Sequence, residues 1–437
     1  MNSNFLCKVY GVRGYRVTGQ CHKDNKTILK IERKHVKICC RHCGNIGISL
    51  DGSRIRDILG VPFGLRKTLL RVRIRRYRCP KCGHVCQESV PFVTGNRHYS
   101  HRFAQYAAVL LKTCTIKSVA TLLSVSWDTV KRIHKDYLRR RYTPVSLKGV
   151  RNIGIDEFSI RRGVEFRTIV VDIDTGRIIH VGRGRGGDAL LPFWKRVRRH
   201  GVRIRYVATD LSPAFVASVL ENAPQATLVF DHFHVVRLMN DALDDIRRTL
   251  YRHERSVMRR RVLLGTRYLL LRNAEDVLDG KHRTRLDNAL AMNEPLSKAY
   301  YMKESMRQIW MQPTKDNAEK ELYAWVEQAR QSNVPRLARM AATIMAHRTG
   351  ILAWYDCHFS TAIVEGINNK IKVLKRNAYG FRDDDYFKLR LFALHDSSIQ
   401  LNCGRTSFGY LINAGRIIAD ITRSYTAASS VSFFLIK

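Results

Sequence analysis

This chain of 437 residues has no apolar stretch that approaches the roughly 18 residues of a membrane-spanning helix. Its first ten residues, Met1 to Tyr10, also lack the apolar core of a secretory signal peptide. These two absences argue against a membrane or secreted protein and predict a cytoplasmic one. In that reducing compartment the 11 cysteines are expected to be thiols or metal ligands rather than a disulfide framework.

Acidic residues are also scarce, with 37 Asp and Glu against 77 Lys and Arg. The formal net charge of +40 exceeds what solubility requires and predicts a polyanionic partner. Nucleic acid is the first candidate, and an anionic membrane surface is the weaker one because no apolar segment accompanies the charge. The hydrophobic fraction of 45% is ordinary for a globular protein, and the length leaves room for about two to four domains.

Four of the cysteines form two C-x2-C pairs, Cys40 with Cys43 and Cys79 with Cys82, and a glycine follows each pair. Glycine at this position frees backbone amides to turn toward the sulfurs, as in zinc ribbons. The alternating residues 69–77 indicate a strand that leads into the second pair. The spacing therefore predicts a structural Zn²⁺ held by the four thiolates. The alternatives are four buried thiols, or a site that uses Cys39, Cys86 or a histidine.

A helix-turn-helix is predicted directly after this region. Residues 103–112 have a helical pattern, and residues 118–133 have the spacing of two short helices, with Ser126 placed to cap the second. The apolar positions expected to form the small core are Val119, Ala120, Leu123, Val125, Val130 and Ile133. The side chains left to meet a DNA groove are Trp127, Asp128, Thr129, Lys131 and Arg132. The alternative is a helical pair that only packs against its neighbours, but the basic run at 139–141 favours phosphate contacts.

From about residue 150 the pattern changes to strands and helices. The predicted elements are strands at 152–160, 166–172 and 177–182, a helix at 188–199, a strand at 205–209, a helix capped by Ser212, and a strand at 227–230. This order resembles the ribonuclease H-like fold. In that fold the first strand carries one catalytic carboxylate and the fourth strand ends on a second, and Asp156 and Asp210 occupy these positions.

The last helix of such a fold does not follow at once. Residues 235–346 are charged and helix-favouring, which predicts a helical insertion. A third carboxylate, Glu365, then lies on a segment with helical periodicity. At about 100° per residue, one face of this helix is apolar and the other carries Glu365, Asn368, Asn369, Lys372, Lys375 and Arg376. The apolar face would pack on the sheet and the polar face would meet metal and phosphate, unless the polar face is simply solvated.

Two strands and one helix are thus predicted to supply three hard oxygen ligands. Such a set suits two Mg²⁺ ions, with Mn²⁺ as a substitute, beside the attacking and leaving oxygens of a phosphodiester. Glu157 is a rival to Asp156, but successive side chains on a strand point to opposite faces, so only one of the two can face the site and Asp156 is preferred. Asp174 fits a hairpin turn, and the acidic run at 383–385 fits the cap of a following helix.

Four stretches resemble the ISL3 family of DDE transposases of bacterial insertion sequences: VEGINNKIK at 364–372, KRNAYGFR at 375–382, FDHFHVV at 230–236 and GIDE at 154–157. The resemblance covers roughly residues 36–396 and includes the zinc ribbon, the helix-turn-helix and the helical insertion. It implies that Asp156, Asp210 and Glu365 are the metal-binding triad.

The same resemblance bears on residues beside the triad. The family's Asp-x-x-His element matches Asp231 and His234, which are expected to lie next to the site rather than to act in catalysis. A histidine packed at the end of a strand is the alternative for His234. Asn368 and Asn369 are also expected beside the site, because they share the helix face of the glutamate.

The predicted fold class is α/β, a ribonuclease H-like catalytic core with a helical insertion, preceded by a zinc ribbon and a helix-turn-helix. The predicted divisions are the zinc-ribbon region at 1–98, the helix-turn-helix at 99–148, the first part of the core at 149–234, the insertion at 235–346, the last part of the core with the glutamate helix at 347–398, and a C-terminal tail at 399–437.

The predicted function is that of a DNA transposase that binds the terminal inverted repeats of an insertion sequence and carries out metal-dependent cleavage and strand transfer. Its partners would be double-stranded DNA, as element ends and as target, and further copies of itself, because two ends must be cut in concert. It would act at the bacterial nucleoid without contacting a membrane. The alternatives are a catalytically inactive DNA-binding regulator derived from a transposase, and a structure-specific nuclease of the same fold.

Overall fold

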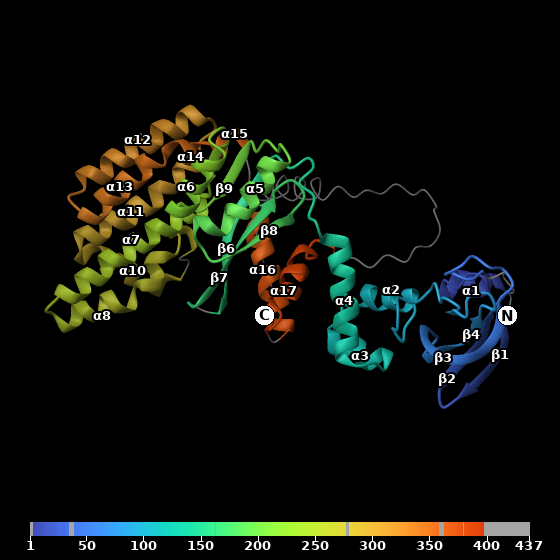
Figure 1. Ribbon diagram of the computed structural model, residues 1–437. Helices are drawn as coiled ribbons and strands as arrows, with labels where there is room; N and C mark the ends of the chain where they lie inside the picture. Colours follow the sequence, from blue (N-terminus) through green and yellow to red (C-terminus); the bar gives the residue numbers. More distant parts are fainter. Residues whose placement is uncertain are drawn as a thin grey trace. The chain divides into compact units, whose positions relative to one another are not determined.

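The computed structural model describes residues 3–34, 39–161, 163–276, 279–357, 362–378 and 380–396. The chain divides into two units, Met1–Ser397 and Ser398–Lys437. The second unit, which holds the whole of the predicted C-terminal tail, lies outside the described residues. Figure 1 labels most of the helices and strands of the first unit. Among the described residues, no helix is both long and apolar enough to cross a membrane.

A mostly antiparallel sheet forms the N-terminal part. Its elements are α1 (Ser3–Tyr10), β1 (Tyr15–Lys23), β2 (Lys26–Arg33), β3 (Ser49–Phe63), β4 (Arg66–Arg78) and β5 (Val85–Gln87). The strand order is β1-β2-β4-β3, and the short β5 pairs with β4. In β4 apolar residues alternate with arginines, so Leu70, Val72 and Ile74 are buried in one core with α1. This confirms the strand predicted ahead of the second cysteine pair.

The helix-turn-helix consists of three helices: α2 (His101–Leu110), α3 (Ile116–Leu123) and α4 (Trp127–Tyr142). The cap of α4 is the predicted one, because Oγ of Ser126 accepts a hydrogen bond from the Thr129 amide at 3.2 Å. Ser124, with a φ of 52°, turns the chain between α3 and α4. Of the six predicted core residues, Val125 is partly buried and the other five are fully buried. The predicted helix-turn-helix is therefore present.

The strands predicted from residue 152 onward form a second five-stranded sheet. They are β6 (Asn152–Arg161), β7 (Glu165–Asp172), β8 (Arg177–Arg183), β9 (Tyr206–Thr209) and β10 (Thr227–Phe230). The order is β10-β9-β6-β7-β8, in which β6, β7 and β8 are antiparallel while β9 and β10 run parallel to β6. This is the topology of the predicted ribonuclease H-like fold, and it places β6 in the centre.

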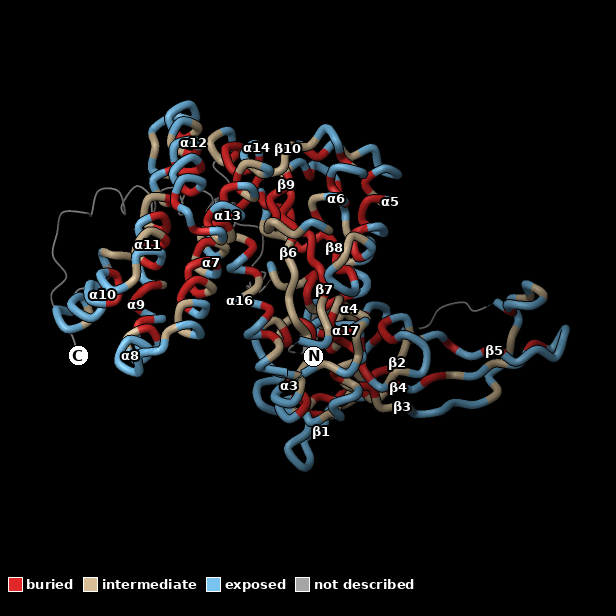
Figure 2. Tube along the Cα trace, turned by 90° about the vertical axis from the view of Figure 1, so that its left-hand side faces the viewer, coloured by how far each residue is buried: buried red, intermediate tan, exposed pale blue. Residues whose placement is uncertain are grey.

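Helices cover both faces of this sheet. They are η1 (Gly187–Leu190), α5 (Leu191–Arg199), α6 (Pro213–Asn222), α16 (Ala362–Asn377) and α17 (Asp384–Phe392). Val170 and Ile179 face η1, α5 and α6, whereas Ile169, Val171 and Ile178 face α16 and α17. Figure 2 shows the resulting concentration of buried residues along the strands. With both faces covered, a ligand site is expected at the carboxyl ends of the parallel strands.

A helical insertion separates β10 from α16. Its elements are α7 (His232–His253), α8 (Val257–Gly265), α9 (Arg267–Leu271), η2 (Ala274–Asp276), α10 (Gly280–Met292), α11 (Glu294–Met306), η3 (Arg307–Trp310), α12 (Lys315–Gln331), α13 (Pro335–Ala346), α14 (Arg348–Leu352) and α15 (Trp354–Cys357). Apart from η2, they share one apolar core, which also includes Phe230 at the end of β10. A Cβ at Gly350 would lie 2.5 Å from the Phe230 ring, so glycine lets α14 approach β10 closely. The predicted insertion is thus attached to the sheet at β10.

The helix α17 packs against α4 through polar contacts. Nδ1 of the buried His134 lies 2.7 Å from the hydroxyl of Tyr386, and Lys135 forms an ion pair of 3.0 Å with Asp383. Burial lowers the pKa of His134 to about 3, so its ring is neutral at pH 7. Asp383 also caps α17 by accepting the amide of Tyr386 at 3.0 Å, as the sequence predicts. These contacts join the helix-turn-helix to the second sheet.

Candidate metal centres and nucleic-acid interface

Two aspartates are brought into register by the parallel strands β6 and β9. Gly154 pairs with Ala208, and Asp156 and Asp210 each lie two residues beyond that pair. Because the strands run side by side in one direction, both carboxylates lie near the same edge of the sheet. Oδ1 of Asp210 accepts the amide of Ser212 at 3.2 Å, which fixes the turn between β9 and α6.

Asp156 is largely buried and held from two sides. Its Oδ1 accepts the amide of Glu157 at 2.7 Å, and its Oδ2 accepts Nδ2 of Asn368 at 2.5 Å. Burial raises the pKa of Asp156, and the negative charge of Asp210 raises it further, against the opposing effects of the Glu157 amide, His234 and Asn368. The two aspartates therefore lie close enough to repel each other.

Glu365 is in the first turn of α16, three residues before Asn368 and on the same face of the helix. The opposite face is the predicted apolar one, with Val364, Ile367, Ile371 and Leu374 buried. The Glu365 side chain is exposed. Within the described parts of the chain, the three predicted triad carboxylates are not all within 4.8 Å of one another. The structure thus aligns the two aspartates and places the glutamate one helical turn from the Asp156 contact.

The close approach of α16 to β6 depends on Gly154. A Cβ at this position would lie 2.6 Å from Cγ2 of Val364, the residue before Glu365. Gly154→Ala should therefore push the start of α16 away from β6 at an overpacking cost of about 1–3 kcal/mol. A displacement of about 1 Å at a reacting centre lowers rates by about a hundredfold, and we expect a loss of that order in DNA cleavage with normal DNA binding.

Gly366→Ala is the matched control for this prediction. Gly366 is in the same helix, and nothing lies within 4 Å of an added Cβ. Alanine should stabilise α16 by roughly 0.5–1 kcal/mol and leave cleavage unchanged. Equal cleavage by both variants, measured on labelled DNA ends, would show that the contact between Gly154 and Val364 does not position Glu365.

Glu157 and Arg185 lie beside the aspartates. Burial raises the pKa of Glu157, and the charge of Asp210 raises it further, whereas Arg185 lowers it. Arg185 is exposed, and its guanidinium carbon lies 5.0 Å from the ring centroid of Phe166. Sequence reasoning missed this arginine, although the glycine- and arginine-rich stretch 182–187 (GRGRGG) was a signal for it.

The Asp-x-x-His element begins α7. Asp231 is buried and caps the helix, because its Oδ1 accepts the amide of Phe233 at 3.1 Å. His234 follows one turn later, and its charge lowers the pKa of Asp156. Nδ1 of His232 lies 3.3 Å from Oδ1 of Asp231. The structure therefore brings His234 close to Asp156, whereas Asp231 stabilises the first turn of α7.

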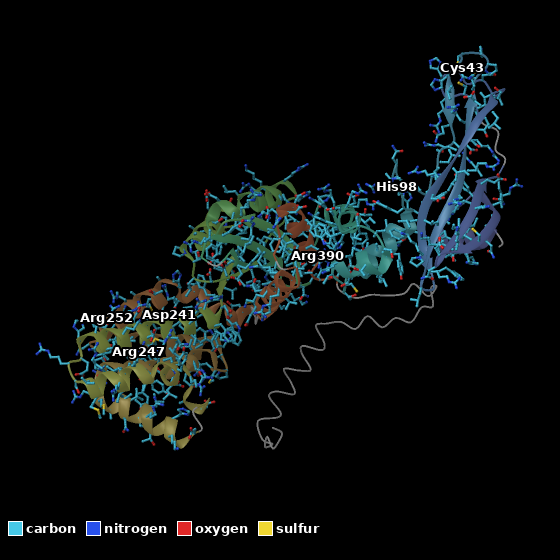
Figure 3. All side chains as sticks on the ribbon, turned by 90° about the horizontal axis from the view of Figure 1, so that it is seen from below. Cys43, His98, Asp241, Arg247, Arg252 and Arg390 are labelled. Atoms are coloured by element: carbon cyan, nitrogen blue, oxygen red, sulfur yellow. The ribbon has the colours of Figure 1, made fainter. Side chains whose placement is uncertain are left out.

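The two cysteine pairs form one cluster at the end of the N-terminal sheet, where Figure 3 labels Cys43. All four sulfurs lie within 4.8 Å of one another, with Cys40 3.6 Å from Cys82 and Cys43 3.5 Å from Cys79. Hydrogen bonds from the Cys82 amide and the Asn45 side chain outweigh the effect of burial and lower the pKa of Cys79 to about 6. Four thiol sulfurs at this spacing fit tetrahedral Zn²⁺.

The two alternative cysteines lie outside this cluster. Cys39 is exposed, and Cys86 packs beside the cluster without contributing a ligand atom to it. Glycines after each pair have positive φ, 72° at Gly44 and 70° at Gly83, and their amides donate to the carbonyls of Cys40 and Cys79 at 2.9 Å. The predicted turn of backbone amides toward the sulfurs is confirmed, because the Cys43 amide donates to the sulfur of Cys40 and the Cys82 amide to that of Cys79.

The predicted DNA-facing residues of α4 differ in their surroundings. Trp127 and Arg132 are exposed, and Oγ1 of Thr129 lies 2.9 Å from Oγ of Ser126. Lys131 instead forms an ion pair of 3.1 Å with Asp383, and its Nζ also lies 5.4 Å from the Trp127 ring. In this conformation Arg132 is the basic side chain of the set that is open to a phosphate, whereas Lys131 is held against α17.

The basic residues of α16 also differ. Lys372 is exposed and its Nζ donates to Oδ1 of Asn369 at 3.1 Å, and Arg376 is exposed. Lys375 instead donates to the carbonyl of Ser159 at 2.6 Å, and burial lowers its pKa. Lys375 therefore ties α16 to β6, a contact that helical periodicity could not predict, and Lys372 and Arg376 are the cations on this face that can meet a phosphate.

This chain joins a ribonuclease H-like sheet with paired aspartates to a zinc ribbon and a helix-turn-helix. This combination of domains is typical of enzymes that act on DNA. Residues 153–391 match a family described as "Transposase". Residues 88–138 match the helix-turn-helix domain of transposase family ISL3, and residues 37–82 match the zinc-finger of transposase IS204/IS1001/IS1096/IS1165.

Two transposases of other insertion sequences agree with these matches. Over 359 residues the chain is 32% identical to the transposase for insertion sequence element IS1001 of Bordetella parapertussis, covering 81% of this chain and 88% of that one. It is 28% identical over 371 residues to the transposase for IS1557 of Mycobacterium tuberculosis, covering 78% and 82%. The Drosophila P element transposase strand transfer complex is similar at a TM-score of 0.40 and 10% identity, over 70% of this chain and 94% of that one.

The chain belongs to the ISL3 family of transposases. It is a DNA transposase with a zinc ribbon and a helix-turn-helix DNA-binding region, as the four sequence stretches predict.

Proposed function

We propose that this transposase binds the terminal inverted repeats of an insertion sequence and cleaves and joins DNA at one metal centre. Asp156, Asp210 and Glu365 are the proposed ligands of that centre. The observation that carries the proposal is the register of β6 and β9, which sets two aspartates side by side next to the helix of the glutamate. No step of the proposed chemistry requires a covalent intermediate with the protein.

The donor set fits a divalent metal. The charge of Asp210 raises the pKa of Asp156, a repulsion that a bound cation would relieve, and oxygen ligands suit Mg²⁺ and Mn²⁺. When bound, two Mg²⁺ ions would activate the attacking oxygen and stabilise the leaving one. Asn368 holds the Asp156 carboxylate in place, and Asp231 and His234 support the same site from the start of α7.

The remaining roles fall to exposed polar side chains. Lys372 and Arg376 lie on the Glu365 face of α16 and are proposed to contact phosphates beside the scissile bond, with Asn369 next to them. In the proposed recognition module, Trp127, Thr129 and Arg132 of α4 meet the groove of the terminal repeat. Lys131 and Lys375 would join in DNA binding only if their present contacts with Asp383 and Ser159 are exchanged for phosphate.

The sequence-based domain limits are proposed as functional divisions, at residues 98, 148, 234, 346 and 398. The zinc ribbon and the helix-turn-helix would recognise the element end, and the two parts of the core would cut it. Because two ends must be cut in concert, we propose a homo-oligomer on DNA, acting at the nucleoid.

Incubation of the purified protein with labelled element ends and Mg²⁺ tests the proposed function. Mapping of the products should show a nick at the boundary of the terminal repeat that leaves a 3′-hydroxyl, and joining of that end to target DNA. Binding to the ends without any nick in Mg²⁺ or Mn²⁺ would contradict the proposal and indicate a regulator. Nicking without joining would indicate a nuclease.

Lys372→Ala and Arg376→Ala should impair cleavage and strand transfer more than recognition of the terminal repeat. They lie about two and three helical turns from Glu365, so they would contact phosphates at the reacting strand rather than in the repeat. Each lost contact should reduce, by about 0.9, the slope with which the logarithm of the binding constant for DNA at the active site falls as the logarithm of salt concentration rises. The contrasting variant is Arg132→Ala, which should weaken end binding first. Normal cutting by the two α16 variants would show that this face is only a solvated surface.

A further inference from the structure

An arginine cluster lies where α7, α8 and α9 meet in the insertion, and we call it the α8 surface. Its exposed members are Arg252, Arg255, Arg259, Arg260, Arg261 and Arg267. Glu254 is the only acidic residue between residues 246 and 273, and that stretch contains no lysine. Figure 1 shows α8 at one end of the insertion, and Figure 3 labels Arg252. A surface of one charge sign, made of arginine alone, indicates a partner with anionic groups.

Three of these six arginines contact protein groups. Arg259 reaches Glu254 only at 4.0 Å, Arg260 lies 4.8 Å from the Tyr251 ring, and Arg267 lies 3.6 Å from Asp244. For Arg252, Arg255 and Arg261, the described part of the chain shows neither an ion pair nor a hydrogen bond. Their guanidinium groups are therefore free to bind an external group.

Large apolar side chains are exposed among these cations. Val257 is 68% exposed, Met258 74%, Leu264 62% and Tyr268 72%. Single exposed apolar residues are ordinary on a protein surface, but four within twelve positions, surrounded by arginine, are typical of a contact surface. The α8 surface thus combines charge for a backbone with apolar groups for sugar or base.

Two buried cations fix α8 and α9, the helices that carry most of the α8 surface. Arg247, paired with Asp244 at 2.7 Å, donates to the carbonyl of Leu263 at 3.2 Å, near the end of α8. Lys303 donates to the carbonyl of Leu270 at 3.0 Å, at the end of α9. Buried charges of this kind are retained only with several partners, so the exposed arginines stand on a fixed support rather than on a loose loop.

We propose that the α8 surface binds the phosphate backbone of duplex DNA, as a contact separate from the zinc ribbon, the helix-turn-helix and the cleavage centre. The inference rests on the proposed function, in which the protein holds element ends and target DNA. Duplex DNA is favoured over a second copy of the chain, because two α8 surfaces facing each other would repel and the chain as a whole carries a net charge of +40. Arginine forks match phosphate oxygens, and the exposed apolar side chains fit the groove edge beside them.

The test compares the wild type with the triple variant Arg252→Ala, Arg255→Ala, Arg261→Ala in the full-length protein. Binding is measured on a duplex that carries the element end with its flanking DNA, over a range of salt concentrations. Loss of three phosphate contacts should lower the salt slope by about 2.7. The control triple variant Lys320→Ala, Arg330→Ala, Arg339→Ala removes the same charge from exposed positions on α12 and α13 of the insertion and should keep the wild-type slope.

A second pair of variants separates charge from apolar contact. Met258→Ala and Tyr268→Ala should weaken binding severalfold at every salt concentration without changing the slope. An unchanged slope in the α8 triple variant, or the same decrease in both triple variants, would overturn the proposal. Loss of self-association in the α8 triple variant with normal DNA binding would overturn it in favour of a protein interface. If the wild type itself neither binds nor cuts the element end, the proposed function fails instead.

Discussion

Asp156→Asn and Asp210→Asn are each expected to abolish cleavage and strand transfer while leaving binding to the terminal repeats nearly intact. Glu365→Gln should behave in the same way. Each change removes one negative oxygen ligand from the proposed metal centre without altering the volume of the side chain. Metal assistance to phosphoryl transfer contributes several kcal/mol, so the rate should fall by roughly a thousandfold or more. Gel assays with labelled element ends measure both binding and cutting.

The stability of the aspartate variants distinguishes a catalytic role from a structural one. Burial and the charge of Asp210 raise the pKa of Asp156, which means that the ionised carboxylate is held at a cost in free energy. Neutral asparagine removes that cost, so Asp156→Asn should unfold at the same temperature as the wild type or higher. Asp174→Asn is the control carboxylate, because Asp174 lies in the turn after β7, where it accepts from Asn152 at 3.0 Å, and it should cut normally. Near-normal cleavage by any triad variant would remove that residue from the centre.

Cys40→Ser and Cys82→Ser should each lose zinc and weaken binding to element ends by at least about tenfold. The four sulfurs converge from two separate loops, and the bound metal supplies much of the folding free energy of such a module. Elemental analysis should find about one zinc per wild-type chain, as expected for a single four-cysteine site. Cleavage of an end supplied at saturating concentration should be affected less than binding, because the cysteines lie in a different sheet from the aspartates.

Cys39→Ser and Cys86→Ser are the matched controls. Both residues were alternatives to the four ligands, and both lie outside the cluster of sulfurs. Each variant should keep about one zinc per chain and bind ends normally. Loss of zinc in Cys86→Ser with retention in Cys40→Ser would reassign the site, and full end binding by metal-free protein would exclude the zinc module from recognition.

Local patterns and order along the chain were enough to predict the core of this fold. The alternation of β4, the Ser126 cap and the order of the strands from β6 to β10 depend on neighbours in the sequence, and all are present. The apolar face of α16 follows from helical periodicity in the same way. Periodicity shows which face of an element is buried. The preference for Asp156 over its neighbour Glu157 stays a prediction, because Asp210 raises the pKa of both carboxylates.

Partners that are distant in the sequence could not be predicted by these means. Lys375 belongs to the polar face of α16, yet its ammonium group donates to the carbonyl of Ser159, 216 residues away in the sequence. Lys131 belongs to the exposed side of the helix-turn-helix, yet Asp383 lies against it. The periodicity of one helix predicts only that a charged side chain lies on its polar face. The partner of that side chain depends on how separate elements pack against each other. For this reason these two lysines hold separate elements of the protein together in this structure.

The position of Mn²⁺ in crystals of the protein bound to an element end would show whether Asp156, Asp210 and Glu365 hold the metal. Anomalous scattering locates the metal without depending on activity. We expect metal at the edge of the sheet beyond β6 and β9, bound by the carboxylates of Asp156 and Asp210 with Glu365 beside them. Ordered Mn²⁺ bound elsewhere, with these three carboxylates free of metal next to the scissile phosphate, would contradict it.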